Sequence, residues 1–265
     1  MESVDEVVKT EHLPLRLLGA LRLVGGLVLD QLYPPVCLKC DAPIASSAGL
    51  CAACFAQLRP ITAPLCPRLG LPFAAWPGEN VLSAEAIAEP PPFARARAAV
   101  LYNEVARTIV SRLKYGDRPE LARFCARLMV GAGHELWGDA AVLVPVPLHP
   151  GRQVQRRYNQ SGELAVGIGR LTGMTVDQHL LRRVKPTRRQ VGLSAAGRAR
   201  NVAGAFAVPP DLVRRLRDRR VVLVDDVYTT GSTVKAATGA LLKAGVGQVD
   251  VITFARVVIG AEMPI

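Results

Sequence analysis

From about Ala94 onward, the chain alternates short apolar runs with segments of helical periodicity. The apolar runs bounded by turn formers predict strands at 98–102, 141–146, 204–208, 220–224 and 249–254. Apolar residues at helical spacing predict helices at 104–114, 119–137, 161–171 and 232–243. Such alternation is typical of an α/β fold, in which helices flank a parallel sheet.

The chain ahead of Ala94 has a different pattern. Between Leu13 and Leu32, apolar residues at helical spacing predict an amphipathic helix. Arg16, Arg22 and Asp30 interrupt it, so we expect no integral membrane segment. We expect the helix to dock on protein, with contact to a membrane surface as the alternative. No internal repeat is evident, and composition separates four regions: an N-terminal helix (1–32), a Cys- and Pro-rich module (33–78), a Pro/Ala linker (79–93) and the α/β domain (94–265).

Composition narrows the class of protein. Half of the 265 residues are hydrophobic and 21% are charged, which excludes disorder over the whole length. A net charge of +11 favours polyanionic partners, either nucleic acid or phosphate-rich small molecules. Residues 1–12 carry four acids and one Lys, unlike the basic start of a signal peptide. We therefore expect a cytoplasmic protein whose six cysteines are reduced, where metal binding is favoured over disulfides.

Two C-x-x-C pairs stand close together in the Cys-rich module. Four thiolates from two such pairs close a tetrahedral structural zinc site and leave no open position for catalysis. The alternatives are a redox dithiol and plain buried thiols. The proposed zinc ligands are Cys37, Cys40, Cys51 and Cys54. Cys66 begins a similar turn in which Leu69 replaces the second Cys, and we expect a buried thiol there, with a spare ligand as the alternative; Cys125 should be core packing.

The interval from Gln178 to Pro210 contains no Asp or Glu. Most of it is expected to be loop, and a long basic loop inside a compact domain is usually functional. A merely solvated basic face is the alternative. The basic residues of the interval are Arg182, Arg183, Lys185, Arg188, Arg189, Arg198 and Arg200.

The segment from Val221 to Thr233 is the most informative. Its continuous apolar run predicts a buried parallel strand, and Asp225 and Asp226 follow at the carboxyl end, where open α/β sheets bind ligands. Hydroxyls and backbone N–H groups then lead into a helix and can hold a phosphate; they belong to Thr229, Thr230, Gly231, Ser232 and Thr233. A ribose 5-phosphate suits such a site, because the carboxylates can bind its hydroxyls or a metal ion at one end and the turn can bind its phosphate at the other. A receiver-type domain carries its acidic pair near the domain start, whereas Asp225 and Asp226 lie late in this domain, so that fold is excluded. A plain helix-capping turn would leave the two carboxylates unexplained.

These residues resemble the phosphoribosyl-pyrophosphate signature of type I phosphoribosyltransferases. More narrowly, the chain resembles the ComF family of competence-associated, phosphoribosyltransferase-like proteins, from Tyr33 almost to the C-terminus. The matching blocks are the Cys pairs, Leu113–Asp117, Val144–Pro150, Arg157–Ser161, Thr187–Ser194, Arg200–Asn201 and Ala205–Phe206. The resemblance implies a type I phosphoribosyltransferase-like parallel sheet flanked by helices and preceded by a small four-cysteine zinc-finger module.

The resemblance also implies roles for site residues. Asp225 and Asp226 would hold the ribose hydroxyls, directly or through Mg²⁺, and Thr229 to Thr233 would hold the 5-phosphate. The turn of Pro147, Leu148 and His149 stands in the place of the pyrophosphate-binding loop. The acid-free stretch, with Arg188 and Arg200, resembles the flexible loop that closes over the site in transferases.

Two functions follow from these expectations. The first is a protein that binds phosphoribosyl pyrophosphate with Mg²⁺ and transfers the sugar to an acceptor that the sequence does not identify, with a role in DNA uptake and natural transformation. The second is a non-catalytic competence factor whose zinc module and basic loop bind single-stranded DNA. Either function implies competence or recombination proteins as partners.

Overall fold

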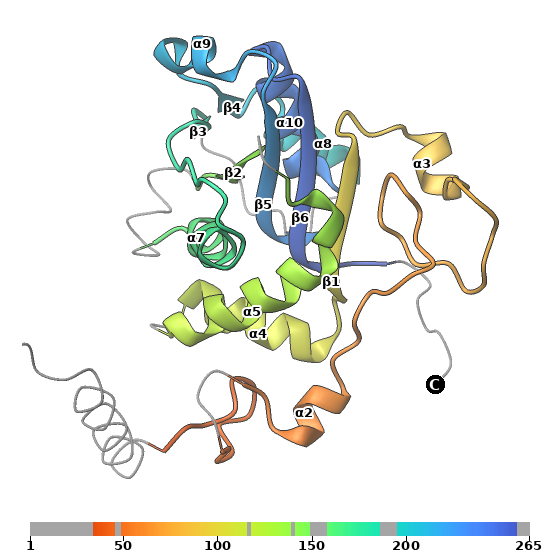
Figure 1. Ribbon diagram of the computed structural model, residues 1–265, viewed down its shortest axis with the longest axis vertical. Coiled ribbons are helices and arrows are strands. Elements are labelled where there is room, and N and C mark those ends of the chain that lie inside the picture. The colour runs from red at the N-terminus through yellow and green to blue at the C-terminus, as the bar shows by residue number, and fades with distance from the viewer. Residues whose placement is uncertain are drawn as a thin grey trace, which may run out of the picture.

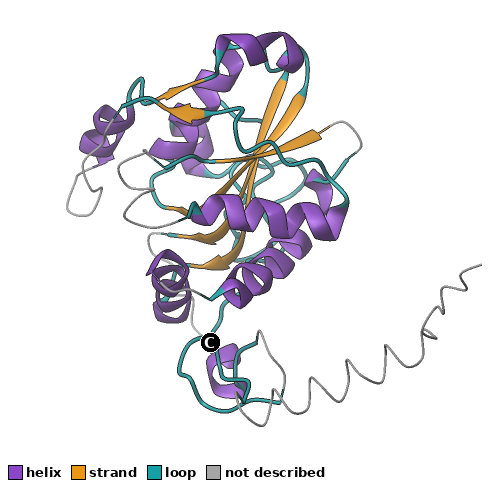
Figure 2. Ribbon diagram, turned by 90° about the vertical axis from the view of Figure 1, so that its left-hand side faces the viewer, coloured by secondary structure: helices purple, strands orange, loops and turns teal. Residues whose placement is uncertain are grey.

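A computed structural model describes residues 34–45, 49–115, 118–138, 141–148, 158–185 and 195–258. Within them, four parallel strands form a central sheet in the order β1-β6-β5-β2, with helices on both faces (Figures 1 and 2). The central strands are β1 (Arg95–Leu101), β2 (Ala141–Pro145), β5 (Arg220–Tyr228) and β6 (Gln248–Arg256). A separate antiparallel pair consists of β3 (Arg182–Arg183) and β4 (Phe206–Ala207).

The α-helices are α2 (Ala52–Ala56), α3 (Ala84–Ala88), α4 (Glu104–Tyr115), α5 (Pro119–Ala132), α7 (Gln160–Thr172), α8 (Ala195–Val202), α9 (Val213–Leu216) and α10 (Ser232–Lys243). Two short 3₁₀ helices, η1 (His134–Leu136) and η2 (Pro210–Leu212), complete the described elements. None of these helices is long and apolar enough to cross a membrane.

Two hydrophobic cores lie on opposite faces of the sheet. Side chains alternate between the faces of a strand, so Val222 and Val224 of β5 pack with α4, α5 and α7. Val221 and Leu223 point the other way and pack with α10. Burial on both faces explains why β5 is a continuous apolar run.

Both edges of the sheet are covered by irregular chain. On the β1 edge, Ile61 N–H donates to Ala99 O (3.0 Å) and Leu101 N–H donates to Arg59 O (2.8 Å). On the β2 edge, Leu143 N–H donates to Thr175 O (2.9 Å). These bonds satisfy edge groups that would otherwise be open to pairing with another chain.

The predicted α/β fold is confirmed, and all four central strands lie where the sequence predicted them. The strand expected at 204–208 is only the two-residue β4, outside the parallel sheet. The expected helix 119–137 ends at Ala132, where Gly133 lies against the Trp137 ring and the chain continues as η1. The expectation of loop over most of 178–210 is wrong for 195–202, because this Ala- and Arg-rich segment forms α8 against α10.

The Cys-rich module enters both cores. Leu38 and Leu58 are buried with α4 and α5. Cys66 and Leu69 are buried on the other face, beside Phe93. The stretch expected as a Pro/Ala linker contains α3 and ends at the buried Phe93. The domain boundaries at 32, 78 and 93 stay predictions, and the expected N-terminal helix lies outside the described residues.

Candidate functional site

The acidic pair lies near the carboxyl end of β5, inside the strand itself. Ser161, in the first turn of α7, donates its hydroxyl to Asp225 Oδ1 (3.0 Å), and the backbone N–H of Asp226 donates to the same oxygen (2.9 Å). Burial and the neighbouring Asp226 carboxylate raise the pKa of Asp225 to about 7, against its ordinary value of 3.8. Burial and the like charge thus disfavour the ionised form of Asp225, and a bound cation would favour it.

Lys114 is a site residue that received no role from the sequence reasoning. It lies in the last turn of α4, and its Nζ is 2.8 Å from Asp226 Oδ2. The turn beside it is fixed by Tyr158, whose hydroxyl donates to Leu113 O (2.6 Å). Leu113–Asp117 is one of the family-like blocks, and this was the signal in the sequence. Lys114 thus brings a positive charge from α4 directly to the acidic pair.

The turn after β5 has the shape of an anion site. Gly231 has φ 72° and stands at the N-cap of α10, where the first helical bond runs from Lys235 N–H to Gly231 O (2.8 Å). The N–H groups at a helix start point out of its N-terminus, toward bound anions. Thr230 and Ser232 join their hydroxyls across the turn (2.8 Å), and Thr229 is exposed. A Cβ at Gly231 would overlap the Tyr228 hydroxyl, so the turn requires glycine.

A buried arginine supports this turn from behind. Arg256, only 2% exposed, lies over the Tyr228 ring with its guanidinium carbon 4.0 Å from the ring centroid. Its Nη1 donates to Leu69 O (2.6 Å), and Phe93 meets Tyr228 edge-on. Burial raises the pKa of Tyr228 to about 12 and lowers the pKa of Arg256. The glycine turn thus rests on a packed stack.

The other predicted site residues divide into two groups. Pro147 and Leu148 are half-buried and leave the sheet beside β5, since Val146 N–H donates to Val224 O (2.9 Å). Arg200 is exposed on α8. His149 and Arg188 lie outside the described residues. Within the described residues, the structure therefore brings together the acidic pair, the Thr/Gly turn and the end of β2.

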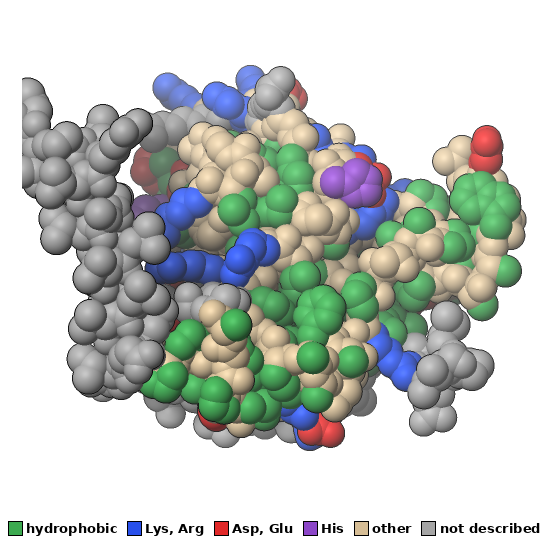
Figure 3. Space-filling model, turned by 60° about the horizontal axis from the view of Figure 1, so that its bottom comes forward, with side chains coloured by type: hydrophobic (Ala, Val, Ile, Leu, Met, Phe, Trp, Pro, Cys, Tyr) green, Lys and Arg blue, Asp and Glu red, His purple; other side chains and the backbone are tan. Residues whose placement is uncertain are grey.

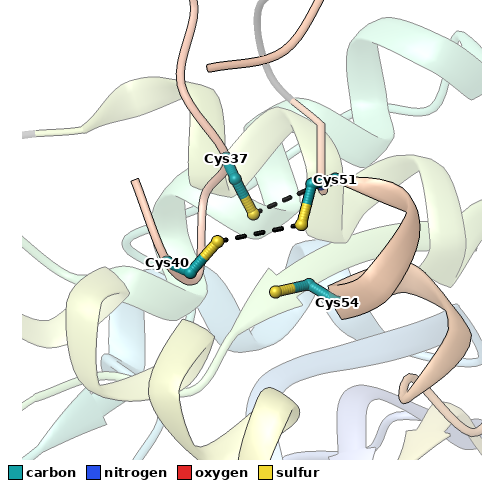
Figure 4. Close-up of side chains that lie close together, drawn as sticks. All are labelled: Cys37, Cys40, Cys51 and Cys54. Atoms are coloured by element: carbon teal, nitrogen blue, oxygen red, sulfur yellow. Dashed lines mark hydrogen bonds between the residues drawn. The ribbon is translucent and has the colours of Figure 1, made fainter. Parts of the chain in front are cut away.

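The four cysteines of the two C-x-x-C pairs form a cluster, shown in Figure 4. Their sulfur atoms all lie within 4.8 Å of one another, and Cys40 Sγ is 3.7 Å from Cys51 Sγ. A tetrahedral zinc ion with Zn–S bonds of about 2.3 Å separates its sulfurs by about 3.8 Å. The geometry and the donor set therefore fit one structural zinc ion.

Electrostatics in the cluster favour metal binding. Burial raises the pKa of Cys37, but N–H groups of Cys51, Cys40 and Lys39 outweigh this effect and lower the pKa to about 6. Burial and the other thiols raise the pKa of Cys54 to about 12. Four thiols at this distance cannot all ionise without a cation, so a metal ion is needed to hold them as thiolates.

The cluster is anchored to α4. Asp41 accepts two bonds from Arg112 (2.7 and 2.6 Å) and one from Arg118 (3.0 Å), and these arginines lower the pKa of Asp41 to about 2. Lys39 lies 3.4 Å from Glu104. Because α4 also carries Lys114, the metal centre and the acidic pair are joined by one helix.

The chain matches two family models. Residues 28–86 match the double zinc ribbon domain, and residues 173–264 match the phosphoribosyl transferase domain. The second range contains β5, the acidic pair and the Thr/Gly turn. Together with the geometry of the four cysteines, the first match supports structural zinc in the N-terminal module.

Similar proteins align over most of the chain. The DNA utilization protein YhgH of Salmonella typhimurium is 33% identical over 229 residues, covering 84% of this chain and 97% of that protein. Competence protein F of Haemophilus influenzae is 32% identical over 229 residues, covering 83% and 96%. Among solved structures, the glutamine phosphoribosylpyrophosphate amidotransferase of B. subtilis aligns at 23% identity and a TM-score of 0.36, covering 54% of this chain and 30% of that one.

The Cys pairs and the β5 signature pointed to one family. The sequence identity to these relatives, which extends over nearly their whole length, points to the same family. The chain belongs to the ComF family, which unites a zinc ribbon with a phosphoribosyltransferase-type domain.

Proposed function

We propose that the protein binds phosphoribosyl pyrophosphate together with Mg²⁺ at the carboxyl end of β5, and acts in DNA uptake. One observation carries the binding proposal: Asp225 and Asp226 run directly into the Gly231 turn at the start of α10. The carboxylates suit the ribose hydroxyls or a hard cation, and the turn suits the 5-phosphate. The names of relatives, Competence protein F and DNA utilization protein YhgH, support the role in DNA uptake.

Each part of the proposed site has a separate task. The carboxylates stabilise positive charge that develops on the ribose when its bond to pyrophosphate breaks. Bound Mg²⁺ would neutralise the leaving pyrophosphate. Pro147 and Leu148, which follow β2, border the side where that group would lie. Transfer also requires a nucleophile from outside the chain, so binding is the first activity to test.

Calorimetric titration of phosphoribosyl pyrophosphate, with and without Mg²⁺, tests this proposal. We expect the wild type to bind, and Asp225→Asn with Asp226→Asn to weaken binding at least about 100-fold, because each lost bond to a charged group is worth about 1.5–3 kcal/mol. Asp211→Asn, an exposed acid in η2, is the control and should bind normally. No binding by the wild type, or equal binding by both proteins, would refute the proposed site.

A second candidate is single-stranded DNA binding. Phe55 and Trp76 of the Cys-rich module are 55% and 71% exposed. Exposed aromatic rings can stack on the bases of single-stranded DNA. Figure 3 shows a face on which hydrophobic side chains gather beside Lys and Arg. This function predicts that fluorescence anisotropy detects DNA binding that weakens with salt. Loss of binding when Arg188, Arg189, Arg198 and Arg200 become Ala would support it, and no binding at low salt would exclude it.

A reducing cytoplasm is the compartment that goes with this proposal. The six cysteines are free thiols, and four of them are gathered at one metal centre. An oxidising compartment would favour disulfides between such neighbours over zinc.

A further inference from the structure

The turn that begins at Cys66 has the same backbone structure as the turn of the first C-x-x-C pair, which begins at Cys37. In the first turn, Cys37 N–H donates to Ala42 O and Asp41 N–H donates to Cys37 O (2.8 and 3.0 Å). In the second, Cys66 N–H donates to Leu71 O and Gly70 N–H donates to Cys66 O (2.8 and 2.8 Å). Asp41 and Gly70 both adopt left-handed backbone, at φ 60° and 64°. Each turn is closed by one antiparallel bridge, Val36 to Pro43 and Leu65 to Pro72.

We call the segment from Cys37 to Cys54 the first ribbon and the segment from Cys66 to Ala86 the second. The second half of the first ribbon also has a counterpart in the second. Cys51 N–H donates to Cys37 Sγ at 3.3 Å, and Ser83 N–H donates to Cys66 Sγ at the same 3.3 Å. Cys51 and Ser83 are N-caps with nearly equal backbone angles (φ −65° for both, ψ 160° and 153°). Each begins a five-residue helix, α2 or α3. The two ribbons therefore correspond position by position.

This correspondence corrects the expectation that the chain has no internal repeat. Cys37, Cys40, Cys51 and Cys54 of the first ribbon match Cys66, Leu69, Ser83 and Ala86 of the second. Three of the four ligand positions carry no thiol in the second ribbon, so the repeat is preserved in the backbone, while the sequence keeps only Cys66 among the ligands. The double zinc ribbon model, which matches 28–86, spans both copies.

A packed core occupies the place of the second metal. Leu69 and Ala86 are 1% and 2% exposed, and they pack in the core that includes Phe93 and Ala96. Cys66 Sγ accepts the Ser83 hydroxyl (3.3 Å), and Ser83 Oγ caps α3 by accepting from Ala86 N–H (3.4 Å). Aliphatic side chains supply no metal ligands, and one thiol with one serine hydroxyl cannot complete a tetrahedral zinc site.

The second ribbon is also connected to Arg256 of β6. Its Leu69 carbonyl accepts the buried Arg256 Nη1 (2.6 Å), and Glu85 of α3 lies 3.4 Å from Arg256 Nη2. This ribbon therefore offers the arginine a backbone carbonyl and a carboxylate. Arg256 in turn supports Tyr228 and the Gly231 turn.

We propose that the second ribbon is a metal-free copy of the first, in which a hydrogen-bonded and apolar core replaces the zinc ion and holds Arg256 under the Gly231 turn. The protein then contains one zinc ion per chain, bound by the first ribbon alone. This inference does not depend on what the acidic pair binds.

Zinc stoichiometry of the full chain, measured by elemental analysis, tests the proposal. We expect one zinc per chain in the wild type, one in Cys66→Ala, and none in Cys37→Ser with Cys40→Ser. Two zinc ions in the wild type, or loss of zinc from a folded Cys66→Ala variant, would overturn the proposal. These measurements need no redesigned ribbon, so they decide it even if a reconstructed variant fails to fold.

Restoring the lost ligands tests the correspondence of positions. Leu69→Cys with Ser83→Cys and Ala86→Cys should raise the content from one zinc to two, and should double the thiolate-to-metal absorption when cobalt replaces zinc. Leu69→Cys alone, which supplies only two thiols, should stay at one. A triple variant with wild-type circular dichroism that still holds one zinc would show that these positions do not correspond.

Discussion

Replacing Asp225 by Asn should stabilise the protein. The pKa of Asp225 is raised from 3.8 to about 7 by burial and by the Asp226 carboxylate, so ionisation of this group opposes folding. A shift of this size corresponds to about 4 kcal/mol at most. Since the side chain is only partly buried and its titration is shared with Asp226, we expect about 2–4 kcal/mol at pH 8.

The pH dependence fixes the sign. Between pH 3.8 and about 7 the unfolded chain loses the Asp225 proton while the folded chain keeps it, so stability falls as pH rises through this window. The Asn variant lacks that fall. Its advantage should be full above pH 7 and vanish near pH 4. An Asn side chain can still accept the Ser161 hydroxyl, so the local structure should persist.

Urea unfolding between pH 4 and 8.5, in buffer without Mg²⁺, measures this effect. The wild-type and Asn curves should meet near pH 4 and diverge toward pH 8. Asp211→Asn, on the exposed η2, should follow the wild type throughout. A variant that is less stable at pH 8, or equally stabilised at every pH, would refute the electrostatic reasoning.

Three further predictions concern the glycine turn, its support and the metal centre. Gly231→Ala should lower the free energy of unfolding by about 1–3 kcal/mol and abolish ligand binding, because Gly231 has a φ of 72° and a Cβ there would overlap Tyr228. The control Gly239→Ala, in open space on α10, should be neutral or stabilising. Equal effects of the two substitutions would contradict the role of the turn. Arg256→Met should lower the free energy of unfolding in urea by about 2–4 kcal/mol, since Leu69 O loses a charged donor. The control Arg214→Met, at an exposed position, should change it by no more than about 0.5 kcal/mol. Similar values for both variants would argue against a supporting role of Arg256 beneath Tyr228. Chelation of zinc should expose the four ligand thiols to a thiol reagent and leave the buried Cys66 and Cys125 protected, and equal reactivity before and after chelation would speak against a metal centre.

Local patterns were sufficient for the parts of the site that lie within one segment. Val221 to Thr233 contains the strand, the acidic pair and the turn in consecutive residues. The zinc ligands likewise come in two short pairs whose spacing specifies the chemistry. The described central strands follow from apolar runs that are buried on both faces.

Contacts between distant segments could not be read from the sequence. Arg256 and Leu69 are 187 residues apart, and only the folded sheet brings α4 to the acidic pair, where Lys114 meets Asp226. The similar turn at Cys66 was evident from the sequence, but the second half of its ribbon was not, because Ser83 and Ala86 replace the ligands there and the repeat lies in backbone geometry. The α8 helix was missed because turn-forming and basic residues around it resembled loop, whereas packing on α10 favours the helix.

The structure of the protein crystallised with phosphoribosyl pyrophosphate and Mg²⁺ tests the central claim most directly. We predict the 5-phosphate at the Gly231 turn, within hydrogen-bond distance of the α10 N-terminus, and the ribose hydroxyls or the Mg²⁺ ion at Asp225 and Asp226. A ligand bound elsewhere, with Asp225 and Asp226 keeping their contacts to Ser161 and Lys114, would contradict it.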